Sequence, residues 1–319
     1  MPMEKIQVPL IIDRTVRLDK YVGDHTSYSR SQIQQLIDTK KLLCDGKEVK
    51  RNHKLRGGES ITFETPQEPP TSIVPEELEL DIPFVHDDFL IVNKATGMVV
   101  HPGKGNWTGT LANGIVHYIQ KDCGEALRPG IVHRIDKGTS GLLVVARNTE
   151  TLHHFQNLFA THNIERTYYA LVWGVPEKSG RVENFLGRHP RDRTKFAVLD
   201  EGKLAITHYE RCAIGLLEQR KVSLIRCKLQ TGRTHQIRVH LSHLGFPLLG
   251  DPIYGRQRQK PISIKHIEHQ LLHAFSLGFV DRHGTHYLFE QDFPVPFSEL
   301  LTSLEIPVPS PKEKTPLEN

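Results

Sequence analysis

The chain has 319 residues, of which 38% are hydrophobic and 24% are charged, and its formal net charge is +4. These values are ordinary for a soluble globular protein with two domains, or with one large domain and an appendage. No run approaches the roughly 18 apolar residues of a membrane span, and four widely spaced cysteines without a C-x-x-C pair argue against a disulfide framework or a zinc knuckle. We therefore expect a cytoplasmic protein without a signal peptide.

Positive charge gathers near the N-terminus. Between Arg14 and Arg56 there are eleven Lys and Arg against five Asp and Glu, a net charge of +6, so the rest of the chain sums to −2. Such a block is typical of a module that docks on a nucleic-acid backbone. The alternative interpretation is a solvated basic face that has no partner.

The basic block coincides with a small predicted domain over residues 13–63. Ser29 and Gln32 form the pattern of a capping box, and apolar residues follow at helical spacing. Short strands are then predicted at 42–44, 48–49 and 60–63. A helix that feeds a basic hairpin is a compact platform for a nucleic-acid backbone.

The remaining chain is predicted to contain a linker, a large domain and a tail. Residues 64–80 are rich in proline and acid and predict the linker, and 306–319, with four prolines and no apolar period, predict a disordered tail. In the domain between them, 81–305, strands are predicted at 89–92, 142–146, 168–172, 222–229 and 287–289, and helices at 110–120, 150–162, 234–244 and 298–304. Strands dominate without strict alternation with helices, so we expect an α+β fold with a mostly antiparallel mixed sheet.

One segment of the large domain, 130–145, is a polar, charged loop that runs into a buried strand. Asp136 stands where the loop ends, which is the usual place for a catalytic side chain on a rigid scaffold. The small turn Thr139-Ser140-Gly141 can hold the backbone of Asp136. A structural Asp that caps local N–H groups is the other interpretation.

A second segment, 229–241, reads as a strand that ends at Gly232 and a helix that begins near Thr234. Arg233 at this junction is expected to face an anion, either a substrate phosphate or a carboxylate such as Asp136. Pairing with a structural acid is the alternative.

The third segment is a predicted strand with adjacent tyrosines, Tyr168 and Tyr169. Alternation along a strand predicts that one of them faces the core and the other does not. A ring that faces a cleft can stack on a base, whereas a plain core aromatic is the simpler interpretation.

Together these segments resemble the RluA family of pseudouridine synthases. The resemblance rests on His-Arg-Ile-Asp-x-x-Thr-Ser-Gly at 133–141, Arg-x-Tyr-x-Ala-Leu-Val at 166–172, Gly-Arg-Thr-His-Gln-Ile-Arg-Val-His at 232–240 and the opening motif at 91–102. Residues 17–63 resemble the S4 RNA-binding module that is often fused to this family. Gly138 stands where the family often has Asp.

The resemblance implies roles for individual residues. Asp136 would be the essential aspartate, Tyr168 the base-stacking tyrosine and Arg233 the basic partner of the aspartate, while Arg134 would enter the RNA stack as the target uridine leaves it. Further substrate contacts are expected from His133, Thr139, His235, Gln236 and Arg238. In the S4-like module, the expected RNA contacts are Arg17, Arg30, Lys40, Lys41 and Lys47.

The implied reaction is the isomerisation of specific uridines in structured RNA, in which the N1–C1′ bond breaks and a C5–C1′ bond forms. Nothing is added or removed, so we expect no cofactor and no metal. Large-subunit ribosomal RNA, free or in a precursor particle, is the favoured partner, and transfer RNA is the second. We expect a monomer and no membrane partner.

Three other classes compete with this interpretation. A metal-dependent hydrolase or nuclease would need a better ligand set than the histidines at 235, 240, 243, 266, 269 and 273, which lack an H-E-x-x-H motif. A glycosidase would need a second acid near Asp136. An RNA-binding or ribosome-assembly protein that has lost catalysis would not need Asp136, Tyr168 and Arg233, and all three are present.

Overall fold

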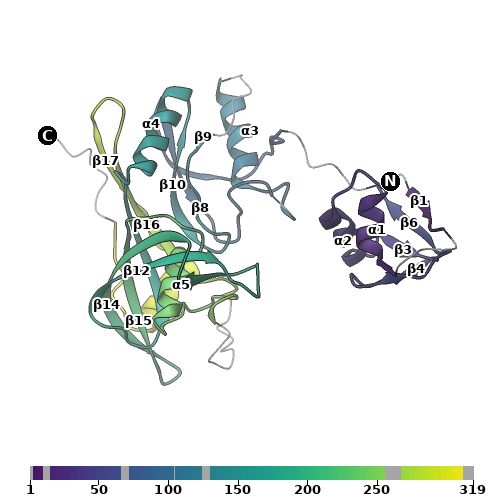
Figure 1. Cartoon of the computed structure of the whole chain (residues 1–319). Coiled ribbons are helices and arrows are strands. Elements are labelled where there is room, and N and C mark those ends of the chain that lie inside the picture. Colours follow the sequence, from purple (N-terminus) through teal and green to yellow (C-terminus); the bar gives the residue numbers. More distant parts are fainter. Residues whose placement is uncertain are drawn as a thin grey trace. The chain divides into compact units, whose positions relative to one another are not determined.

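The structure, a computed structural model, describes residues 3–9, 15–65, 72–103, 105–123, 130–255 and 267–311. The chain divides into two compact units, Met1–Thr71 and Ser72–Asn319, each with its own hydrophobic core (Figure 1). No helix in the described ranges is long and apolar enough to cross a membrane.

The first unit packs two helices on a small sheet. Its elements are β1 (Met3–Gln7), β2 (Val16–Arg17), α1 (Leu18–Asp24), α2 (Arg30–Asp38), β3 (Leu42–Cys44), β4 (Lys47–Glu48), β5 (Lys54–Leu55) and β6 (Ser60–Glu64). The antiparallel sheet has the order β1-β6-β3-β4, and β2 pairs with β5. The capping box at Ser29 and Gln32 is present, which confirms the predicted start of α2. Strand β1 lies outside the predicted domain and pairs with β6 along its whole length.

A buried carboxylate organises the basic side of this unit. Asp19 is fully buried and accepts hydrogen bonds from Arg17, Arg30 and Gln34. Burial raises the pKa of Asp19, but these hydrogen bonds outweigh it and hold the pKa well below its usual range. Asp19 therefore fixes two of the predicted RNA-contacting arginines in place.

The second unit is built on one large sheet. Its strands are β7 (Asp81–Val85), β8 (Phe89–Lys94), β9 (Gly130–Ile131), β10 (Ser140–Ala146), β11 (Glu165–Trp173), β12 (Ser179–Arg188), β13 (Phe196–Leu199), β14 (Lys203–Leu217), β15 (Arg220–Leu229), β16 (Leu272–Val280) and β17 (His286–Glu290). Its helices are α3 (Leu111–Cys123), α4 (Thr149–Ala160), α5 (Gln236–His243) and α6 (Val295–Ser303). The strand order is β13-β12-β14-β15-β11-β16-β10-β8-β7, with β17 on β16 and β9 on β10.

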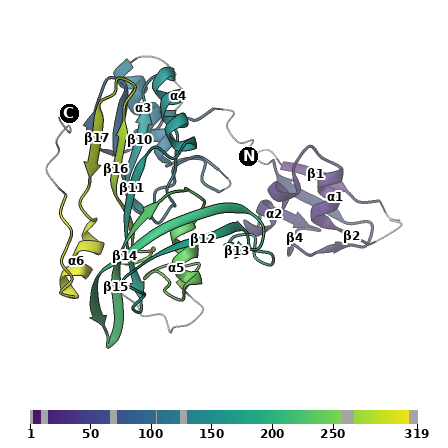
Figure 2. The ribbon, with the colours of Figure 1, turned by 60° about the vertical axis from the view of Figure 1, so that its left-hand side comes forward.

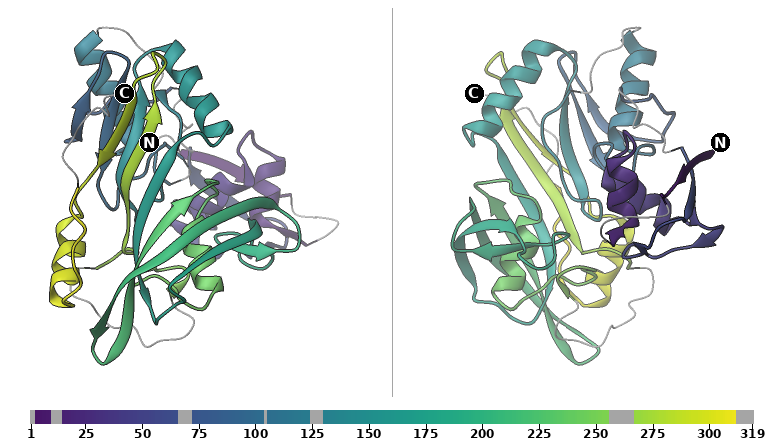
Figure 3. Two further views of the ribbon diagram at one scale, coloured as in Figure 1. Left: turned by 90° about the vertical axis from the view of Figure 1, so that its left-hand side faces the viewer. Right: turned by 45° about the vertical axis from the view of Figure 1, so that its right-hand side comes forward.

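The expected α+β class is confirmed. Within the described residues, β10 and β16 form the one parallel strand pair, and the other pairs are antiparallel. Figure 1 shows α3 and α4 at one end of the sheet and α5 at the other, and Figures 2 and 3 show α5 and α6 on opposite sides of the strands.

Both faces of the sheet are covered, and this corrects one expectation. Apolar residues of α3 and α5 pack on one face, and those of α4 and α6 pack on the other. Tyr168 and Tyr169 are therefore both buried, on opposite faces, whereas alternation predicted one core tyrosine and one outside the core. The sequence pattern reports which face a residue takes but not what covers that face.

The predicted linker and tail are both shorter than expected. Asn113 of α3 donates to the carbonyl of Val74 at 2.7 Å, and Leu80 packs against the core, so residues 72–80 belong to the second unit. At the other end, Ile306 is 2% exposed and packs with α6. Residues 312–319 of the predicted tail lie outside the described residues.

Candidate active site

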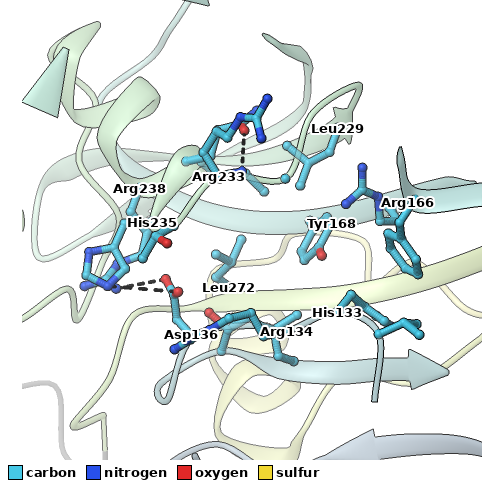
Figure 4. A pocket seen from close by; sticks show the side chains of 18 of the residues that line it. His133, Arg134, Asp136, Arg166, Tyr168, Leu229, Arg233, His235, Arg238 and Leu272 are labelled. Carbon is cyan, nitrogen blue, oxygen red and sulfur yellow. Dashed lines mark hydrogen bonds and ion pairs between the residues drawn. The ribbon is translucent and has the colours of Figure 1, made fainter. Parts of the chain in front are cut away.

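A pocket of about 310 Å³ opens on the sheet face that carries Tyr168. Its walls come from the loop between β9 and β10, from the first half of β11, and from the loop that joins β15 to α5. The pocket brings together Asp136, Tyr168 and Arg238, with Arg134 at its edge (Figure 4). The predicted RNA contacts Arg17, Arg30, Lys40, Lys41 and Lys47 lie in the other unit.

Asp136 is held by its own loop. The backbone N–H of Thr139 donates to the carbonyl of Asp136 at 3.0 Å, and the Thr139 hydroxyl accepts a hydrogen bond from Gln270 at 3.1 Å. A Cβ atom at Gly138 would lie 2.6 Å from the side-chain oxygen of Gln270. The glycine that departs from the family pattern therefore makes room for the residue that braces this loop.

The buried side chain of Lys94 also binds the backbone of this loop. Its side chain is 1% exposed, and its Nζ donates to the carbonyls of Ala95, Met98 and Lys137 at 2.7, 2.9 and 3.3 Å. Burial lowers the pKa of Lys94 to about 7, although the nearby charge of Asp136 acts in the opposite direction. Lys94 was not among the predicted site residues, because its three partners are backbone atoms from two separate segments.

The carboxylate of Asp136 pairs with Arg238 rather than with Arg233. Arg238 donates from Nη1 to Oδ2 of Asp136 at 2.9 Å, and it is 3% exposed. Its Nε and Nη2 donate to Asp251 at 2.8 and 3.0 Å. Burial lowers the pKa of Arg238, but Asp251 and Asp136 outweigh it and raise the pKa above the usual value.

The expected partner Arg233 takes another direction. Its Nε donates to the carbonyl of Leu204 at 2.9 Å, and it lines the pocket without an ion pair to Asp136. The reason is the backbone conformation between Arg233 and Arg238. His235 is left-handed, with φ of 58°, and α5 begins only at Gln236. Arg238 therefore lies in the first turn of the helix and faces Asp136, which corrects the sequence-based assignment.

His235 lies near the second oxygen of Asp136, on the same side as Arg238, with its Nε2 4.0 Å from Oδ1 (Figure 4). Its Nδ1 is 2.9 Å from the hydroxyl of Tyr254. The Tyr254 oxygen accepts from the backbone N–H of Phe196 at 3.0 Å, so its own proton is free to be donated to Nδ1. Burial lowers the pKa of His235, with the charge of Asp136 opposing.

Two predicted substrate contacts have structural partners instead. His133 stacks on Phe159 at 4.5 Å, and its Nε2 accepts from the backbone N–H of Val144 at 3.0 Å. Burial lowers the pKa of His133 to about 3. The side chain of Gln236 hydrogen-bonds Thr231 and the backbone of Arg233 and Ile206. Both residues shape the pocket wall, and Nε2 of His133 and the side-chain amide of Gln236 already have hydrogen-bond partners.

Tyr168 lies in the pocket between its two charged ends. Burial raises the pKa of the Tyr168 hydroxyl, which Arg166 lowers and Asp136 raises, so the phenol stays protonated at neutral pH. Arg134 is exposed. Burial lowers the pKa of His101, and the charge of Arg134 lowers it further.

Within the described residues, no group of three or more His, Cys, Asp or Glu side chains is arranged to hold a metal ion. His266, one of the histidines weighed as a ligand, lies outside the described residues.

Comparison with known proteins places this geometry in context. Residues 88–243 match the RNA pseudouridylate synthase family. The uncharacterized RNA pseudouridine synthase YlyB of Bacillus subtilis is 38% identical over 297 residues, covering 91% of this chain and 95% of that protein. Ribosomal large subunit pseudouridine synthase D of Nitrosomonas europaea is 41% identical over 296 residues, covering 91% of this chain and 84% of that protein.

A solved structure shares the fold. The human RNA Pseudouridylate Synthase Domain Containing 4 protein superimposes with a TM-score of 0.59 at 22% identity, covering 72% of this chain and 95% of that chain. The matched family segment contains Asp136, Tyr168 and Arg238.

Proposed function

This chain belongs to the RNA pseudouridylate synthase family and is an RNA pseudouridine synthase, and from that premise we propose that it isomerises specific uridines of large-subunit ribosomal RNA with Asp136 as the essential carboxylate. The ribosomal target is supported by relatives that are named ribosomal large subunit pseudouridine synthase D. The role of Asp136 is supported above all by its buried ion pair with Arg238.

The geometry suits a carboxylate that must remain charged beside a sugar. Arg238 is held on its far side by Asp251, so it cannot turn away from Asp136 without leaving a buried carboxylate unpaired. The fixed guanidinium binds one oxygen of Asp136 and leaves its second oxygen for the ribose. Attack of this oxygen on C1′, attack on the uracil ring and removal of the 2′ proton are all compatible with this position.

The uridine has to leave its stack to reach the pocket. In our proposal Arg134, exposed at the edge, fills the gap in the RNA, and Tyr168 stacks on the extruded base. The N1–C1′ bond then breaks, the uracil turns, and C5 joins C1′ as the C5 proton leaves. Substrate and product are isomers, so the proposal includes no cofactor.

The test is a map of pseudouridines by carbodiimide-dependent reverse-transcriptase stops in cells with and without the gene. We expect stops in large-subunit ribosomal RNA that vanish on deletion and return with the wild-type gene but not with Asp136→Asn. Stops lost only from transfer RNA would move the target to that RNA. An unchanged map in both RNAs would contradict the proposed function.

A further inference from the structure

Arg166 is the second arginine of the pocket, and it lies at the end away from Asp136. It is on β11, two residues before Tyr168, and both side chains line the same pocket. Figure 4 shows Arg166 and Arg238 at opposite ends, with Tyr168 between them. The sequence motifs and the similar proteins assign no function to Arg166.

Arg166 has no counter-ion in the part of the chain that the structure describes. It is 9% exposed, it forms no ion pair with any described carboxylate, and its Nε has no hydrogen-bond partner. Its closest aromatic neighbour is the ring of Phe159, 5.5 Å from the guanidinium carbon. Burial lowers the pKa of Arg166, with Tyr168 acting in the opposite direction. Burial of a cation without an anion costs free energy, so we expect a ligand to supply the anion.

The surrounding backbone leaves room for this guanidinium. A Cβ atom at Gly232 would lie 2.7 Å from Nη1 of Arg166, so the loop between β15 and α5 passes directly over it. The neighbouring His133 is neutral, because burial and the charge of Arg166 lower its pKa to about 3. The guanidinium therefore faces the pocket from a fixed place and has no counter-ion among the described residues.

The position of Tyr168 indicates which anion Arg166 meets. Residues two apart on a strand share a face and are separated by roughly 7 Å. A base that stacks on Tyr168 therefore turns one edge toward Arg166. An intact uracil is neutral, but when the N1–C1′ bond breaks, its electron pair leaves with the ring, and the negative charge spreads over N1, O2, C5 and O4.

We propose that Arg166 is a catalytic residue that binds and stabilises the uracil anion after the glycosidic bond has broken. The proposal rests on the isomerisation described above. The electron pair that the ring takes from N1–C1′ is returned when C5 bonds to C1′. The C5 proton then leaves and N1 takes up a proton, so the atoms and the charge balance. Arg166 thus opposes a charge that exists only between the two steps.

The rival source of an anion is a phosphate of the RNA, and the two make different predictions. A phosphate contact exists in the bound ground state, so its loss weakens RNA binding and lowers the salt dependence by roughly 0.7–0.9 in log–log slope. Stabilisation of the detached ring exists only during the reaction, so its loss slows the reaction at saturating enzyme and leaves affinity unchanged.

The experiment measures single-turnover rate and RNA affinity at several salt concentrations for Arg166→Met, in the full chain with a structured RNA that contains a mapped target uridine. We expect a rate about 100-fold below wild type with a dissociation constant within about 3-fold. Arg166→Lys should recover about 10-fold of the rate. Arg226→Met is the matched control, because Arg226 is on the adjacent strand β15, pairs with Glu210 and does not line this pocket.

An unchanged rate in folded Arg166→Met would overturn the proposal, and so would weaker binding with a reduced salt slope at an unchanged saturating rate. If thermal melting shows that Arg166→Met does not fold, Arg166→Lys decides: we expect about a 10-fold loss of rate at unchanged affinity, and a full rate contradicts us. Failure of the proposed function is separate, because then the wild-type protein itself would not modify the RNA.

Discussion

The two units of this chain differ in how far the ion pairs of their basic side chains are exposed to solvent. In the first unit, Lys40 pairs with Glu48 and Lys41 with Glu64, and the two lysine side chains are 68% and 42% exposed. In the second unit, Arg238 is 3% exposed and is held by two carboxylates. Exposed pairs contribute about 0–1 kcal/mol and are screened by salt, so RNA phosphates can replace their carboxylates. Buried pairs cannot be exchanged in this way.

The contrast separates affinity from chemistry. Cations that can change partners suit attraction to a long polyanion, and they do so without a fixed geometry. Cations that are locked in a dry pocket suit a reaction in which a charge must be opposed at one place. Substitutions in one unit should therefore change binding, and substitutions in the other should change the rate.

The largest expected effect is that of Asp136→Asn. This change keeps the shape of the side chain but removes the charge that Arg238 holds. We expect the rate of tritium release from RNA with 5-tritiated uridine to fall at least about 1,000-fold. RNA affinity should stay within a few fold, since the first unit is unchanged. Substantial turnover by this variant would remove the contrast between the units.

The next effect is that of Tyr168→Phe. The ring, which in our proposal stacks on the base, is kept and only the hydroxyl is lost, so we expect normal RNA binding, a melting temperature near wild type and a rate about 100-fold lower. Tyr169→Phe is the matched control, because Tyr169 is equally buried but on the opposite face, against Phe275 and Phe293. A damaged Tyr169→Phe beside an unharmed Tyr168→Phe would reverse the assignment of faces.

Local patterns in the sequence singled out Asp136 and Tyr168, and the structure brings both to one pocket, but these patterns did not predict the ion-pair partner of Asp136. Asp136 follows from a polar loop that enters a buried strand, and the structure has both. The choice between Arg233 and Arg238 depends on where α5 begins, and that is set by the left-handed backbone of His235. A residue other than glycine with positive φ is uncommon, so the local sequence does not predict that this histidine is left-handed.

Features that depend on contacts between distant segments could not be predicted from the sequence either. Helix α2, the four helices of the second unit and several strands were predicted from periodicity, whereas α1 and the strand β16, which joins the two halves of the sheet, were not. The lack of a counter-ion at Arg166 and the three carbonyls around Lys94 are also tertiary facts. A sequence shows which charges are present but not which of them are paired.

A smaller effect tests the other side of the comparison. Removal of residues 1–71 takes away the unit with the exposed cations, and we expect affinity for structured RNA to fall about 10- to 100-fold with a shallower salt dependence. The single-turnover rate at saturating enzyme should change little. Filter binding across a series of salt concentrations measures both quantities. Equal affinity and slope for the two proteins would mean that the first unit does not anchor RNA.

The smallest effect concerns the buried charge of Lys94 and appears in stability. The pKa of Lys94 is lowered to about 7 in the folded chain, whereas an unfolded lysine titrates at about 10.4. Between these values the unfolded chain binds one more proton than the folded chain, so this residue makes stability rise with pH, by at most about 1.4 kcal/mol per pH unit. Below pH 7 lysine is charged in both states, and its contribution is constant.

Urea unfolding at pH 6.5 and 9 tests this pH dependence of stability. Tryptophan fluorescence reports the unfolding, since Trp107 and Trp173 both belong to the second unit. Lys94→Met leaves the carbonyls of Ala95, Met98 and Lys137 without their donor, so it should be less stable than wild type at both pH values. The deficit should be larger at pH 9, because only the wild type gains from releasing the proton. Lys47→Met, an exposed lysine of the first unit, should show no such change. A deficit that is equal at both pH values would mean that burial does not lower the pKa of Lys94 in the folded chain.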